Sequence, residues 1–169
     1  MSSTQEYYNE IAKGYDELYG EEQLKKLTLI KNNVPNPKSL LDIGCGTCLA
    51  SKVFFESEYF GVEPAKELVL NSKCKDYFDI ENISFLKAEN YEIKRKFDLI
   101  LIVSVVHHID NLEEFFKRVQ SKCNFLVVSV LNRMSGKEKI VESFSRFFSV
   151  KNKINESKDD IYFLQPKSF

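Results

Sequence analysis

The sequence has almost no net charge and no long hydrophobic run. Lysine and arginine number 24 against 25 aspartate and glutamate, which leaves a formal net charge of −1. Nothing in this balance marks a protein that binds duplex DNA or RNA through bulk charge. The longest apolar stretch, Leu99–Val106, is interrupted by Ser104 and is far too short to cross a bilayer. We therefore expect no membrane segment.

Cysteine and histidine are also scarce. The four cysteines include one C-x-x-C pair, Cys45 and Cys48, and the only histidines are the neighbours His107 and His108. A zinc or redox site on this pair would need a second ligand pair or a helix N-terminus that presents both sulfurs. Met1–Asn9 is polar, unlike a secretory signal peptide. We expect reduced thiols that fill a tight loop, no metal, and a cytoplasmic location.

The composition is typical of one packed α/β domain. The 169 residues are 43% hydrophobic, and short apolar runs alternate with longer amphipathic segments. This alternation predicts βαβ units and a mostly parallel sheet. Strands are expected at 39–44, 59–63, 82–87, 97–103 and 124–130, with one short final strand at 160–165. Helices are expected as a pair within 6–31 and at 49–56, 65–74, about 110–122 and 135–148.

Three parts of this single domain, 1–169, follow from the pattern. They are an N-terminal helical cap (1–36), a cofactor-binding core (37–131), and a minimal C-terminal part with a helix and a short strand (132–169). The break between cap and core is rich in proline and asparagine.

A glycine pair followed by an acidic residue carries the functional signal. Gly44 and Gly46 end the first expected strand, where they permit a tight turn and close approach of a ligand. Glu63 ends the second strand, where a carboxylate can accept hydrogen bonds from both hydroxyls of a ribose. A dinucleotide fingerprint would need a small residue at Leu49, and no P-loop is present. A nucleoside cofactor without a pyrophosphate is therefore favoured.

These residues carry a family resemblance. Asp42–Cys48, read as D-I-G-C-G-T-C, resembles motif I of the class I S-adenosylmethionine-dependent methyltransferases, usually Asp/Glu-x-Gly-x-Gly-x-Gly. Tyr7–Tyr19 resembles the N-terminal helix of their type 11/12 branch, and Phe97–Ile109 resembles their fourth strand with its His-His-Ile ending. The resemblance covers roughly residues 5–131.

The resemblance implies a Rossmann-like sheet of strand order 3-2-1-4-5 with S-adenosylmethionine as cofactor and S-adenosylhomocysteine as product. The cofactor-binding residues that it implies are Asp42, Gly44, Cys45, Gly46, Glu63, Pro64, Ala88, Glu89, Ser104 and Tyr15. The chain departs from the pattern at Cys48, where a third glycine is usual. It also carries Lys87 where many relatives have an aspartate for the adenine amino group, for which Glu89 could substitute.

The sequence offers fewer candidates for catalysis than for cofactor binding. His107 and His108 fall at the end of the fourth strand, where one of two adjacent side chains would face the cleft, and His107 is preferred as general base. Packing is an equal alternative for both. Tyr15 and Asp16 could close over the cofactor as part of a lid. The alternative is that Tyr7, Tyr8, Tyr15 and Tyr19, which recur at near-helical spacing, form an apolar face by which the helix packs on the domain.

The expected activity is methyl transfer to an oxygen, nitrogen or carbon atom of a small molecule, by a monomer or homodimer. Methylation of tRNA or a protein is the first alternative, because the segment Arg133–Lys153 is locally basic, although such runs are more often solvated helix faces. A non-catalytic regulatory protein that binds the cofactor is the second. A nucleotide-dependent oxidoreductase is disfavoured by Leu49.

Overall fold

The computed structural model describes residues 3–169 in two compact units, of which the first ends at Ala88 and the second runs Glu89–Phe169. Among the described residues, no helix is long and apolar enough to span a membrane. The predicted division into cap, core and C-terminal part stays a prediction.

The first unit places three parallel strands in the order β3-β2-β1. Its strands are β1 (Ser39–Ile43), β2 (Glu58–Val62) and β3 (Ile83–Ser84), and its helices are α1 (Thr4–Ile11), α2 (Tyr15–Lys31), α3 (Leu49–Val53) and α4 (Lys66–Leu70). Single 3₁₀ turns lie at η1 (Ala12–Gly14), η2 (Lys75–Tyr77), η3 (Ile80–Asn82) and η4 (Ala88–Asn90), the last of which crosses the boundary between the units. β3 is far shorter than the expected strand at 82–87.

The register of the first two strands determines which side chains share a face. β1 is buried along its whole length, as expected for a strand of a parallel sheet. It pairs with β2 so that Leu40 is opposite Tyr59 and Asp42 is opposite Gly61. Because side chains alternate between faces along a strand, these four positions belong to the same face of the sheet.

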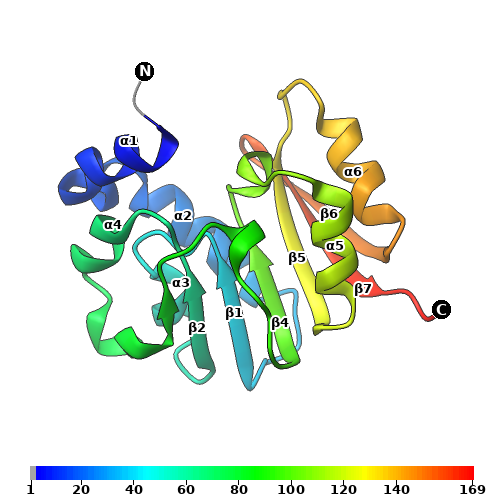
Figure 1. The fold of residues 1–169 in the computed structure, drawn as a ribbon, viewed down its shortest axis with the longest axis horizontal. Coiled ribbons are helices and arrows are strands. Elements are labelled where there is room, and N and C mark those ends of the chain that lie inside the picture. The colour runs from blue at the N-terminus through cyan, green and yellow to red at the C-terminus, as the bar shows by residue number, and fades with distance from the viewer. Residues whose placement is uncertain (1–2) are drawn as a thin grey trace. The chain divides into compact units, whose positions relative to one another are not determined.

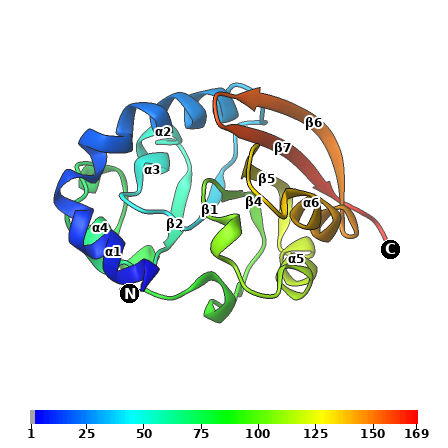
Figure 2. The same cartoon turned by 90° about the horizontal axis from the view of Figure 1, so that it is seen from above.

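The N-terminal helices begin with a strong local signal. Ser3 Oγ accepts from the backbone N–H of Glu6, and the Glu6 carboxylate accepts in turn from the N–H of Ser3, which makes a capping box. α1 lies beside α4 (Figures 1 and 2), and the Asn9 side chain accepts from the backbone N–H of Glu67 in α4. The expected helix pair in the N-terminal region is confirmed.

The second unit orders its strands β4-β5-β7-β6. The strands are β4 (Phe97–Ile102), β5 (Cys123–Leu131), β6 (Phe148–Glu156) and β7 (Asp159–Pro166), with helices α5 (Leu112–Gln120) and α6 (Lys137–Ser145) and the 3₁₀ turn η5 (Val106–His108). β4 and β5 are parallel, whereas β7 is antiparallel to both of its neighbours. Figure 2 shows α5 and α6 on the same face of these strands. The predicted α/β class is confirmed, and the strand order within each unit agrees with the predicted one.

The C-terminal part is larger than expected. Only one short strand was predicted there, but β6 and β7 form a long antiparallel hairpin, and β6 begins where the expected helix 135–148 was to end. β6 is an edge strand with exposed Lys151 and Lys153, and its register shifts between Val150 and Asn152. Charged side chains and a bulge are common on edge strands, because they discourage pairing with another chain. They also erase the alternating pattern that identifies a strand in a sequence.

Aromatic side chains form the core of the second unit. Phe116 of α5 packs edge-to-face on Phe144 of α6 and on Phe148 of β6, with ring centroids 5.8 Å and 6.4 Å apart. Phe144 also contacts Tyr162 of β7. All four side chains are buried.

Candidate functional site

The loop that follows β1 turns sharply before α3 begins at Leu49. Gly44 and Gly46 have positive φ angles of 74° and 54°, which glycine adopts without steric penalty. The backbone N–H groups of Gly44 and Cys45 both donate to the carbonyl of Val62, at 2.7 Å and 3.1 Å. These bonds hold the loop against the end of β2.

Cys48 completes this turn in the left-handed conformation, with φ 59°. A non-glycine residue there is strained, because its Cβ crowds the backbone. The position is the one at which the family pattern has its third glycine, and the geometry explains that preference. Cys48 is fully buried, and its thiol contacts the Cys45 sulfur at 3.6 Å.

The two loop cysteines behave as buried thiols. Burial raises the pKa of Cys45 well above its ordinary value, and the Cys48 hydrogen bond adds to this. The Cys45 side chain fits against Gly61, where a Cβ would approach the Cys45 Sγ to 2.8 Å. Among residues 3–169, no three histidine, cysteine, aspartate or glutamate side chains gather as a metal site would require.

Glu63 follows β2 and joins two backbone segments. Its Oε2 accepts from the backbone N–H of Gly46 at 3.0 Å, and its Oε1 accepts from that of Ala65 at 2.8 Å. Burial raises the pKa of this carboxyl, whereas the hydrogen bonds from Ala65 and Gly46 lower it. The sequence predicted that Glu63 and the glycine pair lie at one place, and the structure brings them into direct contact.

Asp42 lies near the end of β1 as a second buried carboxyl. Burial raises its pKa to about 7, while a hydrogen bond from Tyr59 lowers it and the charge of Glu63 raises it further. The Tyr59 hydroxyl donates to Asp42 Oδ2 at 2.7 Å. Within the described residues, none of the groups that shift the pKa of Asp42 or Glu63 is a lysine or an arginine.

The N-terminal segment packs against residues that follow Glu63. Tyr8 and Tyr15 pack against the buried cluster of Ala12, Ala65 and Leu68. Burial raises the pKa of Tyr15 well above its ordinary value, with further contributions from Tyr8 and Glu63. Tyr15 is thus held near the carboxylate that the sequence assigned to the same site.

Two side-chain bonds tie the same segment to the site loops. The Thr47 hydroxyl in the glycine loop donates to Asp16 Oδ1 of α2 at 2.7 Å. The Gln5 side-chain amide in α1 donates to the carbonyl of Pro64 at 2.8 Å. The N-terminal helices therefore contact both the glycine loop, at Thr47, and the residue that follows Glu63.

The remaining predicted residues lie around the boundary and in the second unit. Ala88 is half-buried at the start of η4, and the Glu89 carboxylate accepts from the backbone N–H of Asp110 at 2.9 Å. Ser104 follows β4 with φ 60°, and its N–H donates to the Ser129 hydroxyl at 2.7 Å.

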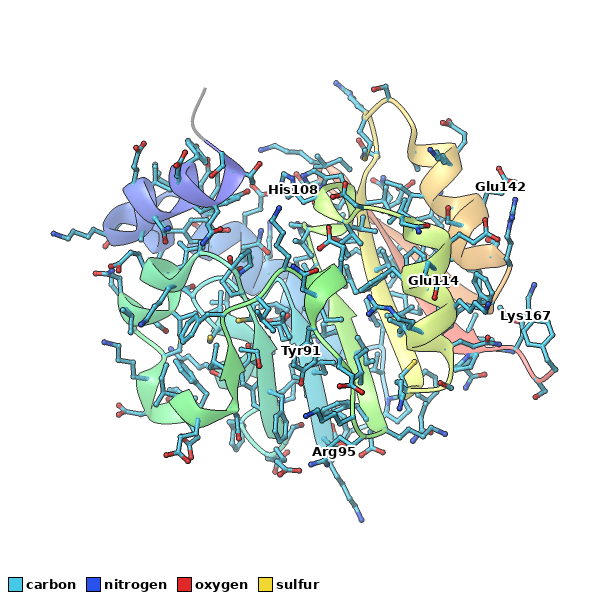
Figure 3. The ribbon with its side chains drawn as sticks, in the orientation of Figure 1. Tyr91, Arg95, His108, Glu114, Glu142 and Lys167 are labelled. Atoms are coloured by element: carbon cyan, nitrogen blue, oxygen red, sulfur yellow. The ribbon has the colours of Figure 1, made fainter. Side chains whose placement is uncertain are left out.

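The histidine doublet does not lie on a strand. His107 and His108 belong to η5, and His108 is visible on this turn in Figure 3. Their rings are 4.0 Å apart, so the expectation that the two side chains point to opposite faces is wrong. Burial lowers the pKa of both imidazoles. For His107 the neighbouring His108 lowers it further and Asp159 opposes the shift.

The sequence did not single out Tyr59 or the Thr47–Asp16 bond. Tyr59 was predicted only as part of a strand, and its contact with Asp42 depends on the strand register, which a sequence does not display. Gly61 is the residue opposite Asp42, and a Cβ there would lie 2.8 Å from the Cys45 Sγ and from the Ile83 Cδ1.

Comparison with known proteins decides the family. The family model described as "Methyltransferase domain" matches residues 41–124, from within β1 to the start of β5. The chain belongs to the class I methyltransferase family. The chain is 31% identical over 115 residues to a malonyl-(acyl-carrier protein) O-methyltransferase of Bacteroides thetaiotaomicron, a match that covers 62% of the chain and 41% of the relative.

Solved structures agree with the fold of this chain. A "SAM-dependent methyltransferase, possible histamine N-methyltransferase" from Thermotoga maritima aligns with a TM-score of 0.72 at 17% identity, over 95% of this chain and 98% of the other. The 16S rRNA methylase RmtB aligns with a TM-score of 0.70 at 16% identity, over 96% and 74%. At such identities the likeness concerns the fold alone. The chain also spans less than half the length of the curated relative.

Proposed function

We propose that this chain binds S-adenosylmethionine in the first unit and transfers its methyl group to a small molecule. The observation that carries the proposal is the Glu63 carboxylate, which is buried and bonded to the glycine loop at Gly46. Each carboxylate oxygen has two lone pairs, so Glu63 retains acceptor capacity for the two hydroxyls of a ribose. The position beyond Gly46 is open, since a Cβ built there meets no heavy atom within 4 Å.

The charge of the site favours this cofactor over a dinucleotide. S-adenosylmethionine carries a sulfonium and an ammonium, and a buried carboxylate without a cationic partner is stabilised by a bound cation. The pyrophosphate of NAD is an anion, and the Asp42 and Glu63 charges would repel it. The buried carboxyls of Asp42 and Glu63 thus support the prediction, made from Leu49 in the sequence, that the cofactor has no pyrophosphate.

When bound, S-adenosylmethionine supplies a methyl group that its positive sulfur already activates. The residues of the chain then have to orient the acceptor and exclude water. Tyr15 and Asp16 are the proposed lid residues, a role supported by the hydrogen bond that Asp16 accepts from Thr47 in the glycine loop. His107 is the proposed general base, because its lowered pKa keeps the imidazole neutral and able to accept a proton at pH 7.

A small-molecule acceptor is favoured by the ion pairs of the basic segment 133–153. Lys137 and Lys153 both bond the Asp160 carboxylate, and Arg146 bonds Glu113 and Glu142. Cations engaged in this way are less available for RNA phosphates than the sequence suggested. Methylation of RNA remains the second candidate. The cytoplasmic location and the oligomeric state remain predictions from the sequence.

The cofactor proposal is tested with Glu63→Gln, which keeps the shape of the side chain and removes its charge. Loss of a charge-assisted bond weakens S-adenosylmethionine binding by roughly 10–100-fold, as calorimetry will measure. Glu67→Gln is the matched control, because it makes the same change on an exposed face of α4. Equal affinities in all three proteins would refute the role of Glu63.

The acceptor class is tested with methyl-labelled S-adenosylmethionine. The purified protein is incubated separately with a small-metabolite extract and with total RNA, at low and high salt. We expect label in the metabolite fraction. Label only in RNA, lost at high salt, would favour the second candidate. Cofactor binding without transfer to either would favour a regulatory protein.

A further inference from the structure

The Tyr59–Asp42 pair is the feature of the first unit that the proposed function does not yet use. Both side chains are buried, with 4% and 5% of their surface exposed, and the hydroxyl–carboxylate distance is 2.7 Å. Tyr59 reaches Asp42 diagonally across β1 and β2, since Gly61 is the residue directly opposite Asp42. A side chain on Gly61 would also collide with Cys45 and Ile83.

The groups that face the Asp42 carboxyl are otherwise acidic. Tyr59 approaches from β2, Glu63 from the residue after β2, and Cys45 from the glycine loop. Burial and the Glu63 charge both favour the neutral acid, and the Cys45 thiol, if ionised, would do the same. Among the groups that shift the pKa of Asp42, the Tyr59 hydroxyl is the one that favours the carboxylate.

A hydroxyl that donates to a carboxylate does two things. It fixes the direction of the carboxylate oxygens, and it stabilises the ionised form relative to the acid. Asp42 lies two residues before Gly44, at the start of the loop that the proposed cofactor would contact. An ionised Asp42 would attract a cationic ligand there, whereas a protonated Asp42 would not.

We propose that Tyr59 is a positioning residue for the cofactor: its hydroxyl orients Asp42 and favours its ionised form, which extends S-adenosylmethionine binding to lower pH. This inference rests on the proposed function, and it assigns to Tyr59 a role that acts wholly through Asp42. Tyr59→Phe removes the hydroxyl and retains the ring, including its contact with Phe78.

The first measurement needs no ligand. The Asp42 side-chain carbon is followed by NMR against pH in protein labelled with ¹³C at the aspartate carboxyl, and the signal is assigned by its absence in Asp42→Asn. In Tyr59→Phe the titration midpoint of Asp42 rises by about one pH unit. Tyr77→Phe, which removes a hydroxyl from an exposed ring in η2, leaves the midpoint where it is in the wild type. Equal midpoints in wild type and Tyr59→Phe would overturn the proposal.

The second measurement follows S-adenosylmethionine affinity against pH by calorimetry. As pH is raised from 6 to 9, the affinity of Tyr59→Phe for S-adenosylmethionine reaches its plateau at a pH about one unit higher than in the wild type. The titration of the ligand itself is common to both proteins and cancels. In the Asp42→Asn background, adding Tyr59→Phe has no further effect, because the residue on which Tyr59 acts is gone.

The outcomes separate the two proposals. A shifted Asp42 midpoint with an unshifted binding profile overturns the role of Tyr59 in binding while the cofactor proposal stands. A wild-type protein that binds no S-adenosylmethionine at any pH refutes the proposed function and the binding role together. In that case the NMR midpoints still decide whether Tyr59 controls the ionisation of Asp42.

Discussion

Replacing Asp42 by asparagine changes how stability depends on pH, because the buried carboxyl titrates differently in the folded and unfolded states. In the unfolded chain an aspartate has a pKa of about 3.9. In the folded protein burial, opposed by Tyr59 and assisted by Glu63, raises the pKa of Asp42 to about 7. Folding therefore takes up a proton between these two values, and the wild type loses stability as pH rises from about 4 to about 7.

The size of the effect follows from the two pKa values. At pH 5 the Asp42 carboxyl is mostly protonated in the folded state and mostly ionised in the unfolded state, whereas at pH 8 it is ionised in both. The wild type therefore loses about 2.5 kcal/mol of stability from pH 5 to pH 8. Asparagine does not titrate, and its side-chain oxygen can still accept from the Tyr59 hydroxyl. The free energy of unfolding of Asp42→Asn, relative to that of the wild type, should therefore increase by about 2.5 kcal/mol from pH 5 to pH 8.

The assay is urea unfolding of both proteins at half-unit pH intervals, followed by circular dichroism. Taking the difference between the two proteins removes the titration of groups that are the same in both. The curves should separate mainly between pH 5 and 7.5. A difference that stays constant over the whole range would show that Asp42 is ionised throughout, and the reasoning from burial would be refuted.

Two further substitutions test one contact in each unit: the close packing at Gly61 in the first and the ion pairs of Asp160 in the second. Gly61→Ala should destabilise the protein by about 1–3 kcal/mol, because its Cβ would lie 2.8 Å from two side-chain atoms, whereas Gly14→Ala, with no atom within 4 Å, should change the free energy of unfolding little. Asp160→Asn should lower it by roughly 1.5–3 kcal/mol at pH 7, because Asp160 accepts from Lys137 and Lys153. The pKa of Asp160 is lowered to about 2, because the hydrogen bonds outweigh burial, so this loss should shrink as pH falls from 4 towards 2. An Asp160→Asn effect that is the same at pH 3 and pH 7 would contradict the ion-pair explanation.

The sequence predicted best where local chemistry and burial act together. β1 is mostly apolar, is followed by Gly44, and is buried throughout, so its pattern and its environment agree. Glu63 could be assigned to the glycine loop because parallel strands end at the same edge of a sheet. The structure adds that the carboxylate bonds the loop backbone directly at Gly46.

Other features were beyond the reach of a single sequence. β6 was missed because an exposed edge strand with lysines carries no apolar alternation. The histidine doublet was treated as strand, but the chain leaves β4 at Ile102 and passes through Ser104, whose left-handed conformation turns it into η5. The Tyr59–Asp42 bond depends on register between two strands, which is a tertiary property.

The most direct test of the central claim is calorimetric titration of the wild-type chain at pH 8 with S-adenosylmethionine, S-adenosylhomocysteine and NAD. The account predicts micromolar binding of both adenosyl ligands and none of NAD, because a buried acidic pair beside a glycine turn accepts a cation and repels a pyrophosphate. Binding of NAD with affinity equal to that of S-adenosylmethionine, or no binding of either adenosyl ligand, would contradict it.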